Sequence, residues 1–251
     1  MQEKNSANRG KLKFIVLALL GILAAVACIF LILKFSPTKD RMPYTEYFGQ
    51  MQPDEAAIVL QNEILPERAI VNEAGSIYLP YDIVKTRLNE RFYLDQDRSL
   101  MRFTTAEQTL EIPFDSAAYT MIDGVLPEDP THEESFDDII VLQKDGSLYL
   151  NLDFAELYTN AVHLYEKETQ HVWIRDQWGD TLMAAASKES AVRFEANIKS
   201  PILTTLEKGD TVVVLEELDA WLRVISPNGF IGYVKSNRMT DPSLVDLQNE
   251  G

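Results

Sequence analysis

Cysteine is almost absent from this chain of 251 residues. The one cysteine, Cys28, lies within a long apolar run, so the residues after that run include none that forms a disulfide or a thiolate metal site. Disulfides staple many small secreted domains, and cysteine thiolates are common ligands of structural zinc. The sequence therefore excludes both kinds of stabilisation after residue 35.

Histidine is also scarce, and the common catalytic motifs are missing. The three histidines, His132, His163 and His171, are widely separated, so we expect each to be solvent-exposed or hydrogen-bonded in a core rather than bound to a metal. The chain has no Gly-x-Ser-x-Gly, no His-Glu-x-x-His and no phosphate-binding loop. We therefore expect no catalytic residues, no metal and no cofactor, and the chain is predicted not to be an enzyme.

Basic residues are too few to bind a polyanion. The whole chain has a net charge of −16, and residues 36–251 hold 38 of the 39 acidic residues but only 18 of the 23 basic ones, which leaves that part at about −20. Nucleic acids and anionic lipid head groups are bound by clustered lysine and arginine. Neither is an expected partner, and the acidity is expected to keep the protein soluble.

A long apolar run is present near the N-terminus. Residues 14–33 contain no charge, and a helix of this length spans roughly 30 Å, the thickness of the hydrocarbon core of a bilayer. Lys4, Arg9, Lys11 and Lys13 precede it, and basic flanks stay in the cytoplasm. We expect a cytoplasmic tail over 1–13, a single-pass transmembrane helix over 14–35 and an extracellular remainder.

Two other fates of the apolar run stay open. Ala25-Val26-Ala27 resembles a signal-peptide cleavage site, and with Cys28 it resembles a weak lipoprotein box. The run continues for five apolar residues beyond Cys28, which favours a retained anchor. A cysteine-free extracellular part is typical of a Gram-positive bacterium rather than of an animal secretory pathway.

The middle of the chain contains an internal repeat. Residues 69–84 and 140–155 match at an offset of 71, with Gly-Ser, Tyr-Leu and an aspartate in register. Each copy predicts a strand, a turn at Gly75 or Gly146, a second strand, a helix and a closing hairpin. Asp82 or Asn151 is placed to cap the helices.

This ββαββ unit, with its Gly-x-x-Tyr-Leu-Pro run, resembles the small N-terminal domain of bacterial copper amine oxidases, which recurs as a stalk in Gram-positive surface proteins. The resemblance covers 66–176 in two copies, 66–112 and 136–176, and implies no copper because copper is bound in a separate domain. The acidic linker from Pro127 to Asp138, and the segment from Asp95 to Ser99, offer carboxylates to calcium but are expected to be solvated turns.

The C-terminal part changes to short β-rich runs. Strands are predicted over 211–215, 221–225 and 230–234, with turns at Lys208-Gly209 and Pro227-Asn228-Gly229. Several short strands in about 60 residues indicate a small closed barrel.

The same region resembles a bacterial SH3 domain over residues 181–240. The resemblance is carried by Val192-Arg193, Ser200-Pro201-Ile202, Lys208-Gly209, Trp221-Leu-Arg-Val224 and Gly229-Phe-Ile-Gly232-Tyr233-Val234. It departs from the family pattern at Phe194-Glu195. The resemblance implies binding to cell-wall peptidoglycan or a related glycan, and aromatic rings suit the flat faces of such ligands. The expected ligand-binding residues are Trp221, Phe230 and Tyr233.

Together these segments predict an α+β chain with one transmembrane helix, two small ββαββ stalk repeats and a small all-β SH3-like barrel. Residues 36–65 are expected to be a juxtamembrane segment, and 241–251 a polar linker or tail. The order resembles the N-terminal part of membrane-anchored glycoside hydrolases of family 18, a resemblance also carried by Tyr44–Gly49 and Asp54–Leu60.

The favoured function is a non-catalytic cell-envelope protein whose barrel binds wall polymer while the repeats act as a spacer. Two alternatives stay open. The chain is the targeting portion of a hydrolase whose Asp-x-x-Asp-x-Asp-x-Glu barrel lies beyond residue 251, or it is a sensor or assembly subunit that binds a protein partner.

Overall fold

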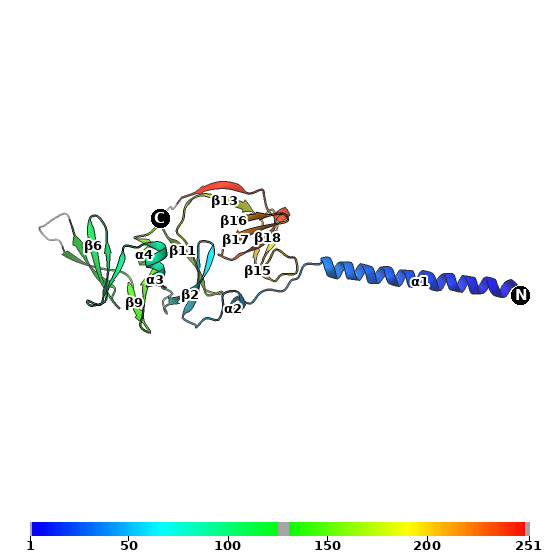
Figure 1. The fold of residues 1–251 in the computed structure, drawn as a ribbon, viewed down its shortest axis with the longest axis horizontal. Helices are drawn as coiled ribbons and strands as arrows, with labels where there is room; N and C mark the ends of the chain where they lie inside the picture. Colours follow the sequence, from blue (N-terminus) through cyan, green and yellow to red (C-terminus); the bar gives the residue numbers. More distant parts are fainter. Residues whose placement is uncertain (1, 125–130, 249–251) are drawn as a thin grey trace.

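The computed structural model describes residues 2–124 and 131–248. α1 (Gln2–Phe35) is one continuous helix that projects from the rest of the chain (Figure 1). The helical backbone begins within the expected tail, 1–13, rather than at residue 14. Its segment Leu17–Phe35 is long and apolar enough to cross a membrane, and none of it is buried against the rest of the described chain. This single N-terminal helix is suited to a membrane anchor or to a signal sequence.

Residues 55–175, which we call the repeat lobe, are built on a seven-stranded sheet of order β11-β12-β1-β2-β3-β10-β9. β1 (Glu55–Leu60) is parallel to β12 (His171–Arg175) and antiparallel to β2 (Glu63–Val71). Residues 56–60 are all buried, because one face of β1 packs on the lobe core and the other packs on the C-terminal domain. The expected juxtamembrane segment therefore supplies a central strand. The remaining strands are β3 (Ile77–Pro80), β9 (Val141–Lys144), β10 (Ser147–Asn151) and β11 (Val162–Glu166).

The two sequence repeats meet at the antiparallel pair of β3 and β10. Leu79 and Leu150 occupy equivalent positions in the two copies and pair directly with each other. On either side, Tyr78 pairs with Asn151 and Pro80 pairs with Tyr149. Tyr78 is equivalent to Tyr149 and Pro80 to Asn151, so the two pairs are related to each other by exchange of the copies. An antiparallel ladder with this register has a local two-fold axis, so the repeat in sequence becomes a two-fold relation in space.

The copies do not form two separate units in series. The hairpin that closes the second copy, β11 and β12, lies in the seven-stranded sheet, whereas the hairpin that closes the first copy lies in a five-stranded sheet. Outside α1 the described residues are mostly β, and the helical segments of the lobe are short. These are α3 (Tyr81–Ile83), η1 (Val84–Leu88) and α4 (Leu152–Glu156).

One of the two expected helix caps is present. The side chain of Asn151 accepts a hydrogen bond from the backbone N–H of Phe154 at 3.1 Å and so caps α4. The cap position of α3 is taken by Pro80, which makes no side-chain bond there, so Asp82 lies inside the first turn instead.

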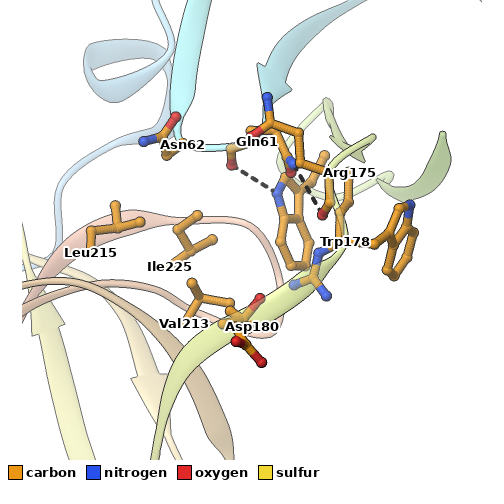
Figure 2. A pocket seen from close by; sticks show the side chains of 11 residues that line it. Gln61, Asn62, Arg175, Trp178, Asp180, Val213, Leu215 and Ile225 are labelled. Carbon is orange, nitrogen blue, oxygen red and sulfur yellow. Dashed lines mark hydrogen bonds between the residues drawn. The ribbon is translucent and has the colours of Figure 1, made fainter. Parts of the chain in front are cut away.

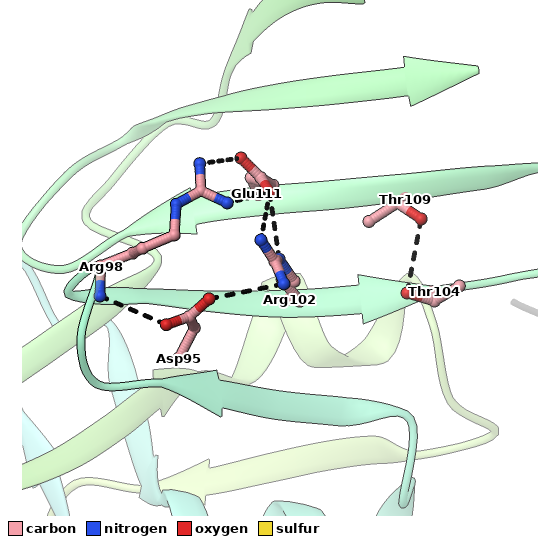
Figure 3. Close-up of polar contacts among 6 residues, drawn as sticks. All are labelled: Asp95, Arg98, Arg102, Thr104, Thr109 and Glu111. Carbon is pink, nitrogen blue, oxygen red and sulfur yellow. Dashed lines mark hydrogen bonds and ion pairs between the residues drawn. The ribbon is translucent and has the colours of Figure 1, made fainter. Parts of the chain in front are cut away.

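The five-stranded sheet is an antiparallel meander of order β4-β5-β6-β7-β8. On one face, Arg98 and Arg102 both bind Glu111, at 2.8 and 2.9 Å, and these arginines lower the pKa of the Glu111 carboxyl (Figure 3). Asp95 lies 3.4 Å from Arg102, so this carboxylate is already paired with a cation. The strands are β4 (Phe92–Asp95), β5 (Leu100–Thr104), β6 (Gln108–Pro113), β7 (Ala118–Asp123) and β8 (Thr131–Ser135).

The acidic linker expected between the copies is in part a strand. Residues 131–135 form β8 and pair with β7, and 127–130 lie outside the described residues. Exposed, acidic β8 has little strand propensity of its own, so its pairing with β7 decides its conformation.

The C-terminal domain, which we call the barrel, has seven strands of order β15-β14-β18-β17-β16-β13-β19. It begins at residue 179, and the segment expected to be a polar linker or tail forms β19 along β13. Its core contains Val192, Val212, Val224 and Val234. The elements are β13 (Gly179–Ala185), β14 (Ser190–Arg193), β15 (Ile202–Leu206), β16 (Thr211–Leu218), β17 (Trp221–Ile225), β18 (Ile231–Lys235), η2 (Ser236–Arg238) and β19 (Ser243–Leu247).

A third hydrophobic core joins the lobe, the barrel and the segment after α1. It contains Ala57 and Val59 of β1, Leu203 and Phe230 of the barrel, and Phe48 at the end of α2 (Tyr44–Tyr47). We call this contact the junction. Because one cluster of buried side chains draws on all three segments, the lobe and the barrel pack directly against each other.

The barrel, although last in the chain, lies next to the end of α1 (Figure 1). Residues 38–42 run along β15, with the N–H of Met42 bonded to the Ile202 carbonyl at 2.9 Å. Lys199 Nζ donates to the carbonyls of Leu33 and Ser36, both at 2.6 Å. These carbonyls lie at the C-terminal end of α1, where the negative end of the helix dipole stabilises a cation. The repeat lobe is farther from α1, which differs from the expectation that the repeats separate the helix from the barrel.

Candidate functional site

The outward side chains of β17 and β18 form one surface with aromatic and basic groups. Trp221 pairs directly with Lys235, and Arg223 pairs with Tyr233, across the antiparallel ladder. Side chains alternate between the two faces of a strand, so these four lie on the same face while the residues between them are buried in the barrel core. We call these four residues the Trp221 face. Two of the three expected ligand-binding residues, Trp221 and Tyr233, are thus brought together.

All four side chains of the Trp221 face are half-buried. Lys235 Nζ lies 5.7 Å from the centre of the Trp221 ring, within the range of a cation–π contact. The contact holds a flat apolar ring beside a charged donor. Such a pair suits a ligand that has both an apolar face and polar groups.

A cavity of about 350 Å³ opens beside Trp221, toward the end of α1. Its charged lining is Glu189, Arg193, Lys235 and Arg238. Arg193 is engaged inside the protein, because its guanidinium donates to the carbonyls of Ser200 and of residue 38 at 2.7 and 3.0 Å, and burial lowers its pKa. Lys235 and Arg238 are in none of the ion pairs found among the described residues, so their charges face the cavity or the solvent.

Phe230, the third expected contact, is not on the Trp221 face. Its side chain is only 1% exposed and lies in the junction core. Its ring is 5.1 Å from that of His171, 5.4 Å from Tyr47 and 5.5 Å from Phe48. In this arrangement Phe230 holds the barrel against the lobe, and a ligand reaches it only if the junction opens.

His171 is a neutral histidine that is hydrogen-bonded in a core, which is one of the two environments expected for the histidines. Its Nε2 lies 2.8 Å from the carbonyl oxygen of Asn228, so Nε2 carries the proton, and Nδ1 accepts from the hydroxyl of Thr169 at 2.6 Å. Burial lowers the pKa of His171 to about 4, against the smaller opposite effect of the bond to Asn228. This hydrogen bond crosses the junction from β12 to the Pro227–Gly229 turn of the barrel.

The other two histidines are paired with carboxylates. His163 Nδ1 lies 2.8 Å from Glu156, and Nε2 lies 3.9 Å from Asp153. Burial lowers the pKa of His163, but the hydrogen bond and charge of Glu156, helped by Asp153, outweigh it and raise the pKa. Although these three groups lie close enough to hold an ion, their mutual charge pairing accounts for the cluster. His132 lies 3.0 Å from Asp123 on an exposed surface.

A second cavity, of about 240 Å³, lies where the lobe meets the barrel, and sequence reasoning did not find it (Figure 2). Trp173 and Arg175 of the lobe and Trp178 of the loop that follows line it on one side, while Asp180 and Ile225 belong to the barrel. The signal in the sequence was the run Trp-Ile-Arg-Asp-Gln-Trp, which places two of the three tryptophans of the chain around an arginine. The run looked like an ordinary strand because the residues that complete the cavity come from other segments, and two of them, Gln61 and Asn62, precede it by more than 100 positions.

Comparison with known protein families matches residues 188–240 to the bacterial SH3 domain. This confirms the domain predicted for 181–240 and covers the whole Trp221 face. The bacterial SH3 domain is a binding domain rather than a catalytic one, and the match describes residues 188–240 of the chain. A search of curated proteins finds no match. The comparisons do not confirm the resemblance of 66–176 to copper amine oxidase domains, or that of the chain to family 18 glycoside hydrolases.

Proposed function

We propose that this chain is a non-catalytic protein of the cell envelope whose barrel binds peptidoglycan or a related wall glycan through the Trp221 face. The single observation that carries the proposal is the register of β17 and β18, which places Trp221 and Tyr233 beside Arg223 and Lys235 on an outward surface of a bacterial SH3 domain. Bacterial SH3 domains are commonly wall-binding modules.

The chemistry of the Trp221 face suits a peptidoglycan strand. Sugar rings have an apolar face that packs on an indole or phenol ring, and the peptide stems carry carboxylates that pair with lysine or arginine. Tyr233 and Trp221 supply the rings, and Arg223, Lys235 and Arg238 supply the charges. Phe230 does not belong to this contact surface, because its ring is buried in the junction.

Attachment to a membrane through α1 would make weak binding sufficient. A tethered site meets its ligand at an effective concentration of about 1 mM, which half-occupies a site with a Kd of about 1 mM and largely occupies one with a Kd of about 0.1 mM or below. The barrel lies beside the end of α1, so in an anchored protein the Trp221 face would be near the membrane. The repeats then extend outward beyond the barrel instead of acting as a spacer beneath it.

The proposal is tested by co-sedimentation of the full chain, kept in detergent, with purified peptidoglycan. Trp221→Ala is expected to raise the Kd for peptidoglycan about tenfold or more, because truncating one central aromatic contact costs about 1.4–2 kcal/mol. Tyr93→Ala is the matched control, since Tyr93 is an aromatic residue 58% exposed on the five-stranded sheet of the lobe. Equal sedimentation of wild type and Trp221→Ala would refute the assignment of the face.

A further inference from the structure

The cavity at the junction contains a cation held against two aromatic rings. Trp173 and Arg175 are two residues apart on β12 and point to the same face, and Trp178 follows in the loop before β13. Arg175 Cζ lies 5.0 Å from the centre of the Trp173 ring and 5.5 Å from that of Trp178 (Figure 2). The guanidinium is therefore within cation–π distance of both indoles.

Arg175 has no acidic partner among the described residues. It takes part in none of the ion pairs of that part of the chain, although acidic residues are far more numerous than basic ones. Burial lowers the pKa of Arg175, but an arginine remains charged at neutral pH. A partly desolvated cation without an anion is costly, and a ligand carboxylate that pairs with both ends of the guanidinium would relieve that cost.

The rest of the cavity adds two exposed polar side chains that suit ligand hydroxyls, the amide of Asn62 and the carboxylate of Asp180. The backbone carbonyl of Gln61 accepts from Trp173 Nε1 at 3.2 Å, and the Gln61 amide donates to the Gln177 carbonyl at 3.3 Å. These bonds fix the hairpin turn that carries the exposed amide of Asn62, and Asp180 lies on the barrel side. An amide and a carboxylate around flat rings make a lining of apolar and polar groups, which suits a sugar.

A smaller cavity of about 180 Å³ shares Trp173, Arg175 and Trp178 and is completed by Val162, His163 and Leu164. Neither cavity reaches the roughly 300–1,000 Å³ of sites for drug-sized ligands. Each is instead of a size for about one sugar ring, and they adjoin at the same arginine. A ligand of two consecutive sugar rings would place one ring in each cavity.

The two cavities that share Trp173, Arg175 and Trp178 are together called the junction cleft. We propose that this cleft binds a saccharide that carries a carboxylate, with a sugar ring stacked on Trp173 or Trp178 and the carboxylate paired with Arg175. The site is separate from the Trp221 face, and it does not depend on that face binding the wall. Because residues of both the lobe and the barrel line the cleft, the ligand would also bridge the two domains.

Calorimetric titration of the full chain, in a detergent without a sugar head group, tests this proposal with two matched probes. Methyl β-D-glucuronide carries a carboxylate where methyl β-D-glucoside carries a hydroxymethyl group. The wild-type chain is expected to bind the glucuronide at least tenfold more tightly than the glucoside. Arg175→Gln is expected to abolish that preference while weak binding of the glucoside is kept, and Trp178→Ala is expected to weaken binding of both sugars.

Two controls separate a lost site from a lost fold. Arg91→Gln removes an exposed arginine elsewhere in the lobe and is expected to leave the preference unchanged. The urea midpoint of each variant, measured in the same detergent, shows whether the chain still folds. The proposal is overturned if the wild type binds neither probe, if it binds both equally, or if folded Arg175→Gln keeps the preference. Binding of acetyl-D-alanyl-D-alanine in place of the glucuronide would also overturn it, in favour of a peptide carboxylate.

Discussion

The close approach of one barrel turn to the repeat lobe requires a glycine at position 229. Gly229 lies in the Pro227–Gly229 turn with φ +81°, and a Cβ at this position would be 2.8 Å from the Cβ of Trp173 and 3.2 Å from Nε2 of His171. Both neighbours belong to β12, in the middle of the junction. We therefore expect Gly229→Ala to push the turn away from the lobe.

The loss in the free energy of unfolding expected for Gly229→Ala has two parts, which a control variant separates. Placing alanine in a left-handed conformation costs about 1–2 kcal/mol, and overpacking a tight contact costs a further ~1–3 kcal/mol. Gly209 lies in another turn of the same barrel, with φ +100° and no atom within 4 Å of the added Cβ. Gly209→Ala therefore carries the backbone cost alone, and Gly229→Ala carries both.

The assay is urea unfolding of the full chain in detergent, followed by tryptophan fluorescence. We expect the free energy of unfolding to fall by about 1–2 kcal/mol for Gly209→Ala and by about 2–5 kcal/mol for Gly229→Ala. Equal losses in the two variants would show that Gly229 is not packed against β12. The barrel would then not be docked on the lobe as described.

Two further predictions concern the same junction. The pKa of His171 falls from 6.5 in the unfolded chain to about 4 in the folded chain, so the unfolded state binds the proton more readily. The contribution of neutral His171 to the free energy of unfolding is therefore fully present above pH 6.5 and falls by up to about 3 kcal/mol as the pH drops toward 4. His171→Gln should flatten this dependence when urea unfolding is measured at several pH values. The Tyr47 hydroxyl accepts from the Ile231 N–H at 3.0 Å and donates to the Ile231 carbonyl at 2.8 Å, so Tyr47→Phe should lower the free energy of unfolding by about 1–3 kcal/mol in the same assay. Tyr44 is 39% exposed, so Tyr44→Phe should change it very little. A pH-independent stability, or equal effects of the two tyrosine variants, would contradict this description.

Local patterns in the sequence were enough to find the barrel. The run Trp221–Ile225 is rich in β-branched and aromatic residues, and the Asn-Gly turn before residue 230 indicates the hairpin that the structure contains. The alternation of side chains along these strands also places Trp221 and Tyr233 on the outer face. Asn151 was found as a cap because capping depends on residues only three positions away.

Features that depend on distant partners were not found. Phe230 looks like a surface ring in its own segment, and partners distant in the sequence bury it. Residues 44–48, more than 180 positions earlier, and His171 of β12 pack against its ring. The same holds for β1, whose apolar run was placed in a juxtamembrane segment because its parallel partner β12 follows 111 residues later. β19 pairs with β13 although most of its side chains are exposed, so its apolar and polar pattern carried little signal.

The most direct test of the central claim is hydrogen–deuterium exchange of the full chain in detergent, with and without soluble peptidoglycan fragments. If the Trp221 face binds the glycan, amides of β17 and β18 should gain protection, with the largest change around residues 221–223 and 233–235. Absence of protection there, or protection confined to the repeat lobe, would contradict the assignment of the barrel as the wall-binding domain.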